Sequence, residues 1–142
     1  MTERVLLVDD EEEYLEIMSE RMRARDIEVT ASTSAREALN MIATESYDAV
    51  IMDFMMPDMN GIEALKIIKE KNPEMQIILL TGHATVEKTV EAMKAGAMDL
   101  IEKPADLDAL SEKIKNAHNK KALFVAKKDQ DRVIEMLKKF GI

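Results

Sequence analysis

The stretch RVLLVDDEEE, residues 4–13, decides the fold, because it joins a short apolar run directly to a cluster of acidic residues. The apolar residues 5–8 are continuous rather than alternating, which is typical of a parallel strand buried on both faces. Asp10 and the three glutamates after it are expected in the first turn of a helix, at the positive end of its dipole. The stretch therefore predicts a strand, an acidic turn and a helix.

The same alternation continues along the chain. Further continuous apolar runs predict strands at residues 48–52 and 76–80, and shorter, mixed runs predict edge or near-edge strands at 27–31 and 98–101. The helices between them and after the last one begin at side chains that suit an N-cap, namely Ser34, Asn60, Thr85 and Asp106. Five such alternations predict an α/β fold, a doubly wound parallel sheet with helices on both faces.

Composition excludes several classes of protein. The 142 residues suit one domain, and 20 Lys and Arg against 28 Asp and Glu give a net charge of −8, which argues against direct nucleic-acid binding. The chain has no Cys, so disulfides and thiolate metal sites are ruled out. The longest apolar run, residues 122–126, is far too short to span a membrane, and the N-terminus has no signal-peptide pattern. We therefore expect a cytoplasmic protein that does not bind a membrane.

Chemically useful side chains follow the predicted strands, at the sheet edge where ligands bind in such folds. They are Asp9, Asp10, Asp53, Thr81 and Lys103. Two carboxylates about 4 Å apart repel each other by roughly 4 kcal/mol near a protein surface, so three require a cation. Lys103 supplies one positive charge, and Mg²⁺ suits a site of oxygen ligands without His or Cys. A carboxylate held there is a plausible nucleophile toward phosphorus, and Thr81 could donate a hydrogen bond to a phosphoryl oxygen.

Four motifs resemble the receiver domain of two-component response regulators. They are VDD at residues 8–10, MDFMMPDMNG at 52–61, LTG at 80–82 and AGAMDLIEKP at 95–104. The stretch from 81 to 104 is most similar to receivers of the nitrogen-regulation class. The resemblance covers roughly residues 2–119 and implies a flavodoxin-like sheet of five parallel strands in the order 2-1-3-4-5, with five helices.

The resemblance also implies the chemistry of the acidic cluster. Asp53 would be the phosphoacceptor, receiving a phosphoryl group from a histidine kinase or a phosphotransfer protein of a phosphorelay. Mg²⁺ would be held by Asp10, Asp53 and the backbone carbonyl of Met55, with Asp9 acting through water. Such a protein is a phosphorylation switch with at most slow autodephosphorylation, and not a turnover enzyme.

The switch residues implied by the resemblance include one departure from the family pattern. Thr81 would be the switch hydroxyl and Lys103 the phosphate partner, with a cis peptide bond before Pro104. Receivers usually carry Tyr or Phe three residues before this Lys, and here the position holds Leu100. We therefore expect signalling to depend less on a rotating aromatic ring and more on the loop after the fourth strand.

Two further positions bear on the lifetime of the phosphoryl group and on alternative functions. Met55 and His83 lie where relatives tune dephosphorylation. A Mg²⁺-dependent phosphatase working through an aspartyl phosphate is the main alternative, but that class usually has a second Asp at the position of Met55. A nucleotide- or flavin-binding domain would need a Gly-rich loop where the acidic residues 9–13 stand.

The chain is expected to have two parts, a receiver at residues 1–119 and a C-terminal helical extension at 120–142. A short helix is predicted from Asp129, with an apolar stripe formed by Val133, Ile134, Leu137 and Phe140. The extension could be a linker helix toward an output domain, or it could dock on a partner. A homodimer is possible through the fourth helix, the fifth strand, the fifth helix or this tail, and the downstream effector cannot be named from the sequence.

Overall fold

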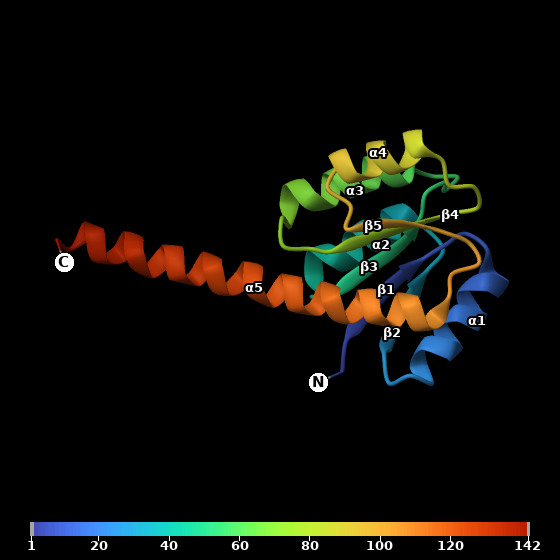
Figure 1. Ribbon diagram of the computed structural model, residues 1–142, viewed down its shortest axis with the longest axis horizontal. Coiled ribbons are helices and arrows are strands. Elements are labelled where there is room, and N and C mark those ends of the chain that lie inside the picture. The colour runs from blue at the N-terminus through green and yellow to red at the C-terminus, as the bar shows by residue number, and fades with distance from the viewer. Residues whose placement is uncertain (1, 142) are drawn as a thin grey trace.

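The computed structural model describes residues 2–141; Met1 and Ile142, the outer ends of the two expected parts, lie outside the described residues. Strands and helices alternate along the whole chain (Figure 1). In order they are β1 (Arg4–Val8), α1 (Glu12–Arg23), β2 (Glu28–Ser32), α2 (Ala35–Thr44), β3 (Ala49–Asp53), α3 (Gly61–Lys71), β4 (Ile77–Thr81), α4 (Val86–Lys94), β5 (Asp99–Glu102) and α5 (Leu107–Lys139).

The five strands form one parallel sheet in the order β2-β1-β3-β4-β5, which confirms the predicted topology. The last four strands each end one residue later than predicted. The reason is that the parallel ladder continues to the last residue: the Asp53–Leu80 and Thr81–Glu102 pairs are still in register. Asp53 and Thr81 are therefore the final residues of β3 and β4, held by the sheet rather than by loops.

Helices cover both faces of the sheet, so two of its three inner strands, β3 and β4, are fully buried. α1 and α5 pack on one face around Leu15, Met18 and Ile114, while α2, α3 and α4 pack on the other around Leu65 and Ala92. Every residue of β3 and β4 is buried. Burial on both faces explains why these strands read as continuous apolar runs.

Four of the helices begin at the predicted capping residues. The side-chain oxygens of Ser34, Asn60, Thr85 and Asp106 each accept a hydrogen bond from a backbone N–H in the first turn of α2, α3, α4 or α5. α1 differs from the expectation, because it begins at Glu12 and Asp10 lies before it. Asp9 Oδ1 accepts a hydrogen bond from the N–H of Glu11, the N-cap residue, at 2.9 Å. This bond keeps both aspartates in the turn at the sheet edge.

The separate short helix predicted from Asp129 is wrong: α5 is one continuous helix of 33 residues, Leu107–Lys139. The sequence from 107 to 139 contains neither Gly nor Pro, so nothing in it interrupts the helix. Its first turns pack on the sheet, and its C-terminal half projects away from the α/β part (Figure 1). No helix within residues 2–141 is both long and apolar enough to cross a membrane.

Candidate functional site

Three carboxylates meet where β1 and β3 end. Asp9 and Asp10 follow β1, and Asp53 is the last residue of β3. Each offers a carboxylate oxygen, and these oxygens all lie within 4.8 Å of one another. Asp9 and Asp53 are buried, whereas Asp10 is exposed. The sheet thus gathers three negative charges that stand up to 44 positions apart in the sequence, as the strand-end pattern predicted.

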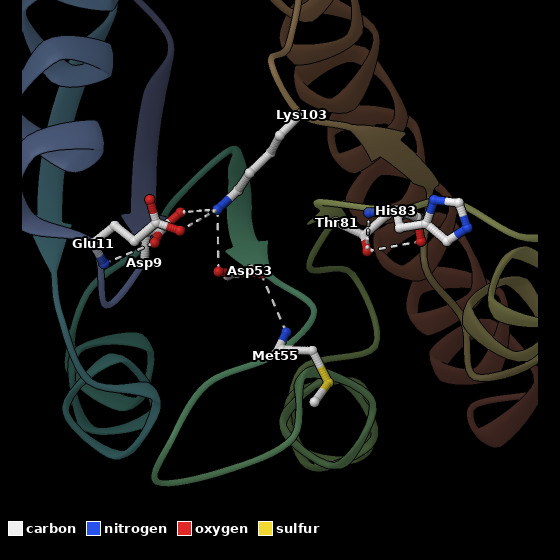
Figure 2. A network of polar contacts seen from close by, with 7 residues as sticks. All are labelled: Asp9, Glu11, Asp53, Met55, Thr81, His83 and Lys103. Atoms are coloured by element: carbon white, nitrogen blue, oxygen red, sulfur yellow. Dashed lines mark hydrogen bonds and ion pairs between the residues drawn. The ribbon is translucent and has the colours of Figure 1, made fainter.

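Lys103, just after β5, reaches across the sheet edge into this cluster (Figure 2). Its Nζ donates hydrogen bonds to Asp9 Oδ2 at 2.7 Å and to Asp53 Oδ2 at 3.1 Å. Burial alone would lower the pKa of Lys103, but the hydrogen bonds with Asp9 and Asp53 outweigh it and raise that pKa. Lys103 is therefore a permanent cation that bridges two buried carboxylates.

The carboxylate of Asp53 is held in place and is short of compensating charge. Burial raises its pKa, and the N–H of Met55 and the Lys103 ammonium offset this only in part. The Met55 N–H donates to Asp53 Oδ1 at 3.2 Å, so each oxygen of Asp53 has one donor. The ionised form of Asp53 is consequently less stable here than in water. A second cation beside the carboxylate would stabilise that form.

Tyr14 is a site residue that the sequence reasoning missed. Its ring centroid lies 4.6 Å from the Lys103 Nζ, within cation–π range. The signal available in the sequence was its position four residues after Asp10, close to the acidic turn. The ring limits where the Lys103 ammonium can move.

The loop between β4 and α4 forms the other side of the site. The Thr81 hydroxyl donates to the carbonyl of His83 at 3.3 Å and accepts from the His83 N–H at 3.3 Å, and the His83 ring points away from Asp53 (Figure 2). Two residues that sequence reasoning missed hold this loop: Lys88 Nζ donates to the His83 carbonyl at 2.8 Å, and Glu102 accepts from the Ala84 N–H at 2.8 Å. The fold thus places Glu102, the last residue of β5, beside the loop that follows β4.

The remaining predicted positions surround the cluster. The Lys103–Pro104 peptide bond is cis. Leu100 in β5 is partly buried against the core formed by α2, α3 and α4. The Met55 side chain is 63% exposed and directed away from Lys103 (Figure 2). His118 lies apart from the cluster, mid-way along α5, and its Nδ1 is 2.6 Å from Asp48 Oδ1.

Comparison with known proteins agrees with this geometry. Residues 5–115 match the sequence model of the response regulator receiver domain. The chain belongs to this family. The receiver is 39% identical over 108 residues to the regulatory protein AtoC of Escherichia coli, a match that covers 76% of this chain and 23% of AtoC. It therefore spans about a quarter of the length of such curated relatives.

Solved structures show the same fold for the receiver. A response regulator receiver domain protein from Clostridium thermocellum superposes with a TM-score of 0.80 at 35% identity, covering 86% of this chain and 98% of that one. The beryllofluoride-activated NtrC4 receiver domain dimer superposes with a TM-score of 0.78 at 32% identity, covering 83% and 98%. The likeness to NtrC4 agrees with the predicted similarity to the nitrogen-regulation class.

Proposed function

We propose that this receiver accepts a phosphoryl group on Asp53 from a histidine kinase or phosphotransfer protein in the cytoplasm, and acts as a phosphorelay switch. The observation that carries this is the placement of Asp53 Oδ2, 3.1 Å from the Lys103 Nζ at the end of the central strand. One Asp53 oxygen attacks phosphorus, the bond from phosphorus to the donor nitrogen breaks, and the electron pair leaves with the donor imidazole. Lys103 remains beside the phosphoryl oxygens and offsets their charge.

The acidic cluster fits Mg²⁺. All donors are oxygens, and three carboxylates face a single, partly buried ammonium, which leaves the pocket with excess negative charge. Asp10, Asp53 and the backbone carbonyl of Met55 would hold the ion, with Asp9 acting through water. Bound there, Mg²⁺ would supply the positive charge that phosphoryl transfer to a carboxylate requires.

The conformational response to phosphorylation would pass from Asp53 to Thr81 and then to α4. In the proposed switch the Thr81 hydroxyl gives up its bonds to His83 and turns to a phosphoryl oxygen, which pulls on the loop that Lys88 and Glu102 hold. Leu100 offers no ring to report this movement, so the backbone of the loop carries it. α4 exposes the apolar side chains of Val86, Val90 and Met93. A downstream effector would bind at this surface.

The phosphatase alternative gains nothing from the geometry. The position two residues after Asp53 holds the exposed thioether of Met55, which cannot serve as an acid or a base. Slow loss of the phosphoryl group would then depend on water, with Met55 and His83 the residues most able to affect its access. The protein would accordingly act as a switch whose phosphorylated state has a limited lifetime.

Acetyl phosphate with Mg²⁺ tests the proposal. Intact mass should rise by one phosphoryl group, and Asp53→Asn or chelation of the metal should abolish the gain. Asp129→Asn, an equal change at an exposed position on α5, is the matched control and should be labelled like the wild type. Labelling of Asp53→Asn would contradict the assignment of the acceptor.

Beryllofluoride with Mg²⁺ tests the switch separately. Amide chemical-shift changes should centre on residues 81–90, which include the loop and the first turns of α4. Changes confined to the residues around Asp9, Asp10 and Asp53 would contradict the proposed route through the loop.

A further inference from the structure

A groove between α2 and α3 lies apart from the acidic cluster. Its volume is about 650 Å³, which is within the usual range of sites that bind small molecules. The two helices cover the face of the sheet opposite the one on which α1 and α5 pack. The residues that line the groove include none of the three aspartates of the cluster and not Lys103. The groove is therefore a candidate for a binding site of its own.

The floor of the groove is apolar. Ile42 of α2 and Ile68 of α3 line it and are buried in the core of this face. Leu39, Met59 and Ile67 also line it, but these three side chains are only partly buried. A hydrocarbon chain lying along the groove would cover them, and removing their apolar surface from water would favour binding.

A cationic residue stands at each end of the groove. Arg36 lies in the first turn of α2, and Lys71 is the last residue of α3. Both helices follow strands of one parallel sheet and cover the same face, so they run in similar directions and place these two residues at opposite ends. At 1.5 Å per residue, α2 rises roughly 12 Å between Arg36 and its last residue, Thr44. The two positive charges are therefore separated by most of the length of the groove.

The receiver itself does not neutralise these two cations. Among residues 2–141, the ion pairs include neither Arg36 nor Lys71. The carboxylate of Asp58 lies at the start of α2, but it accepts hydrogen bonds from the Ser34 hydroxyl and from the backbone N–H of Arg36, not from the guanidinium. The acidic residues of α2 and α3 do not line the groove; they are Glu37, Glu63 and Glu70. In a chain with a net charge of −8, this groove is therefore a site that favours anions.

The two ends of the groove offer different hydrogen-bond donors. Asn72, the C-cap residue of α3, follows Lys71 and also lines the groove. Its backbone N–H donates to the Ile68 carbonyl at 2.7 Å, which fixes its position, and its side-chain amide can donate to an anionic group. The end near Lys71 thus combines an ammonium with an amide. The end near Arg36 presents a planar guanidinium, which can form two parallel hydrogen bonds to one carboxylate.

We propose that this groove binds an elongated dicarboxylate, with its hydrocarbon chain on the apolar floor and one carboxylate at each end. Arg36 holds one carboxylate, and Lys71 with the amide of Asn72 holds the other. The separation of the two anchors selects for length, because a dicarboxylate much shorter than about 12 Å reaches only one of them. The proposal goes beyond the phosphorylation switch and does not depend on the chemistry of Asp53.

Titration of the full chain with sebacate, a linear dicarboxylate with a long hydrocarbon chain, tests the site. Amide chemical shifts should change saturably in residues 36–43 and 67–72, and the diol of the same chain length and the much shorter succinate should each bind about tenfold more weakly or less. Equal binding of the diol, shifts centred on Lys103, or no saturable shift at millimolar sebacate would overturn the proposal. Shifts in the groove with a helical peptide that carries Glu on both sides of a Leu pair, and none with sebacate, would assign the groove to a partner protein and refute our ligand class.

Charge-neutral variants test the two anchors. Arg36→Gln and Lys71→Gln should each weaken sebacate binding by about three- to fivefold, the size expected for an exposed ion pair. Lys66→Gln is the matched control, because Lys66 is also an exposed lysine of α3 but does not line the groove, and it should leave the affinity within about twofold. All three side chains are exposed, and equal melting temperatures would show that the variants are folded. An equal affinity for all three variants would refute the anchors. Both experiments stay informative if Asp53 is never phosphorylated, which separates this inference from the proposed function.

Discussion

Gly61→Ala should strain the strand end that carries Asp53. Gly61 is the first residue of α3, and its N–H donates to the Phe54 carbonyl at 2.9 Å. A Cβ built at this position would lie 2.8 Å from the Phe54 oxygen, 2.9 Å from the Asp53 oxygen and 3.0 Å from the Phe54 Cα. All three atoms belong to the backbone, so no side chain can rotate away. Either α3 or the end of β3 must move.

The magnitude follows from the cost of overpacking, typically about 1–3 kcal/mol. Gly82→Ala is the matched control, because a Cβ there meets nothing within 4 Å and the change carries the same loss of unfolded-state entropy. The difference between the two variants isolates the clash. At about 3 °C per kcal/mol for a chain of this size, Gly61→Ala should melt roughly 3–10 °C below Gly82→Ala.

Thermal unfolding followed by circular dichroism measures that difference, and acetyl phosphate labelling measures its effect on the site. Displacement of the Asp53 carbonyl should also shift the carboxylate from Lys103, so we expect labelling of Gly61→Ala to slow by about tenfold or more. Equal melting temperatures for the two alanine variants would refute the packing argument. A clear melting difference with unchanged labelling would show that α3 yields and the strand end does not.

Three further predictions concern the residues around the site. Tyr14→Leu should slow acetyl phosphate labelling by about two- to fivefold through loss of the cation–π contact with Lys103, while Tyr14→Phe, which keeps the ring, should not. Asp53→Asn should raise the melting temperature in metal-free buffer at neutral pH. Burial raises the pKa of Asp53, so its ionised form opposes folding above that pKa, and the gain should vanish as the pH falls below about 4. Asp58→Ala should cost about 1 kcal/mol in unfolding free energy, since Asp58 accepts hydrogen bonds from the backbone N–H groups of Ala35 and Arg36 at the start of α2. These bonds, that of Arg36 foremost, lower the pKa of Asp58, so its stabilising effect should fade as urea unfolding is repeated at pH values falling through that pKa.

Much of the fold was predictable from local chemistry. Continuous apolar runs identified β1, β3 and β4, because a strand buried on both faces leaves no room for polar residues. Shorter, mixed runs marked β2 and β5, the two edge strands. Four N-caps were predicted because the first turn of a helix needs side-chain acceptors. The ends of the last four strands were each missed by one residue, because hydrogen bonding to a neighbouring strand, which a local pattern does not contain, extends the ladder to Asp53 and Thr81.

By itself, the sequence determined the strand–helix alternation, the strand ends where the reactive groups would meet, and the apolar stripe in the tail. These follow from local periodicity and from the rule that parallel strands place their carboxyl ends at one edge. Only the tertiary structure decided that the Tyr14 ring lies over the Lys103 ammonium, that Lys88 and Glu102 hold the switch loop, and that α5 runs unbroken beyond the sheet with its apolar residues exposed. The contacts of Tyr14 with Lys103 and of Ala84 with Glu102 join residues distant in sequence, and their geometry is set by how the packed elements fit together.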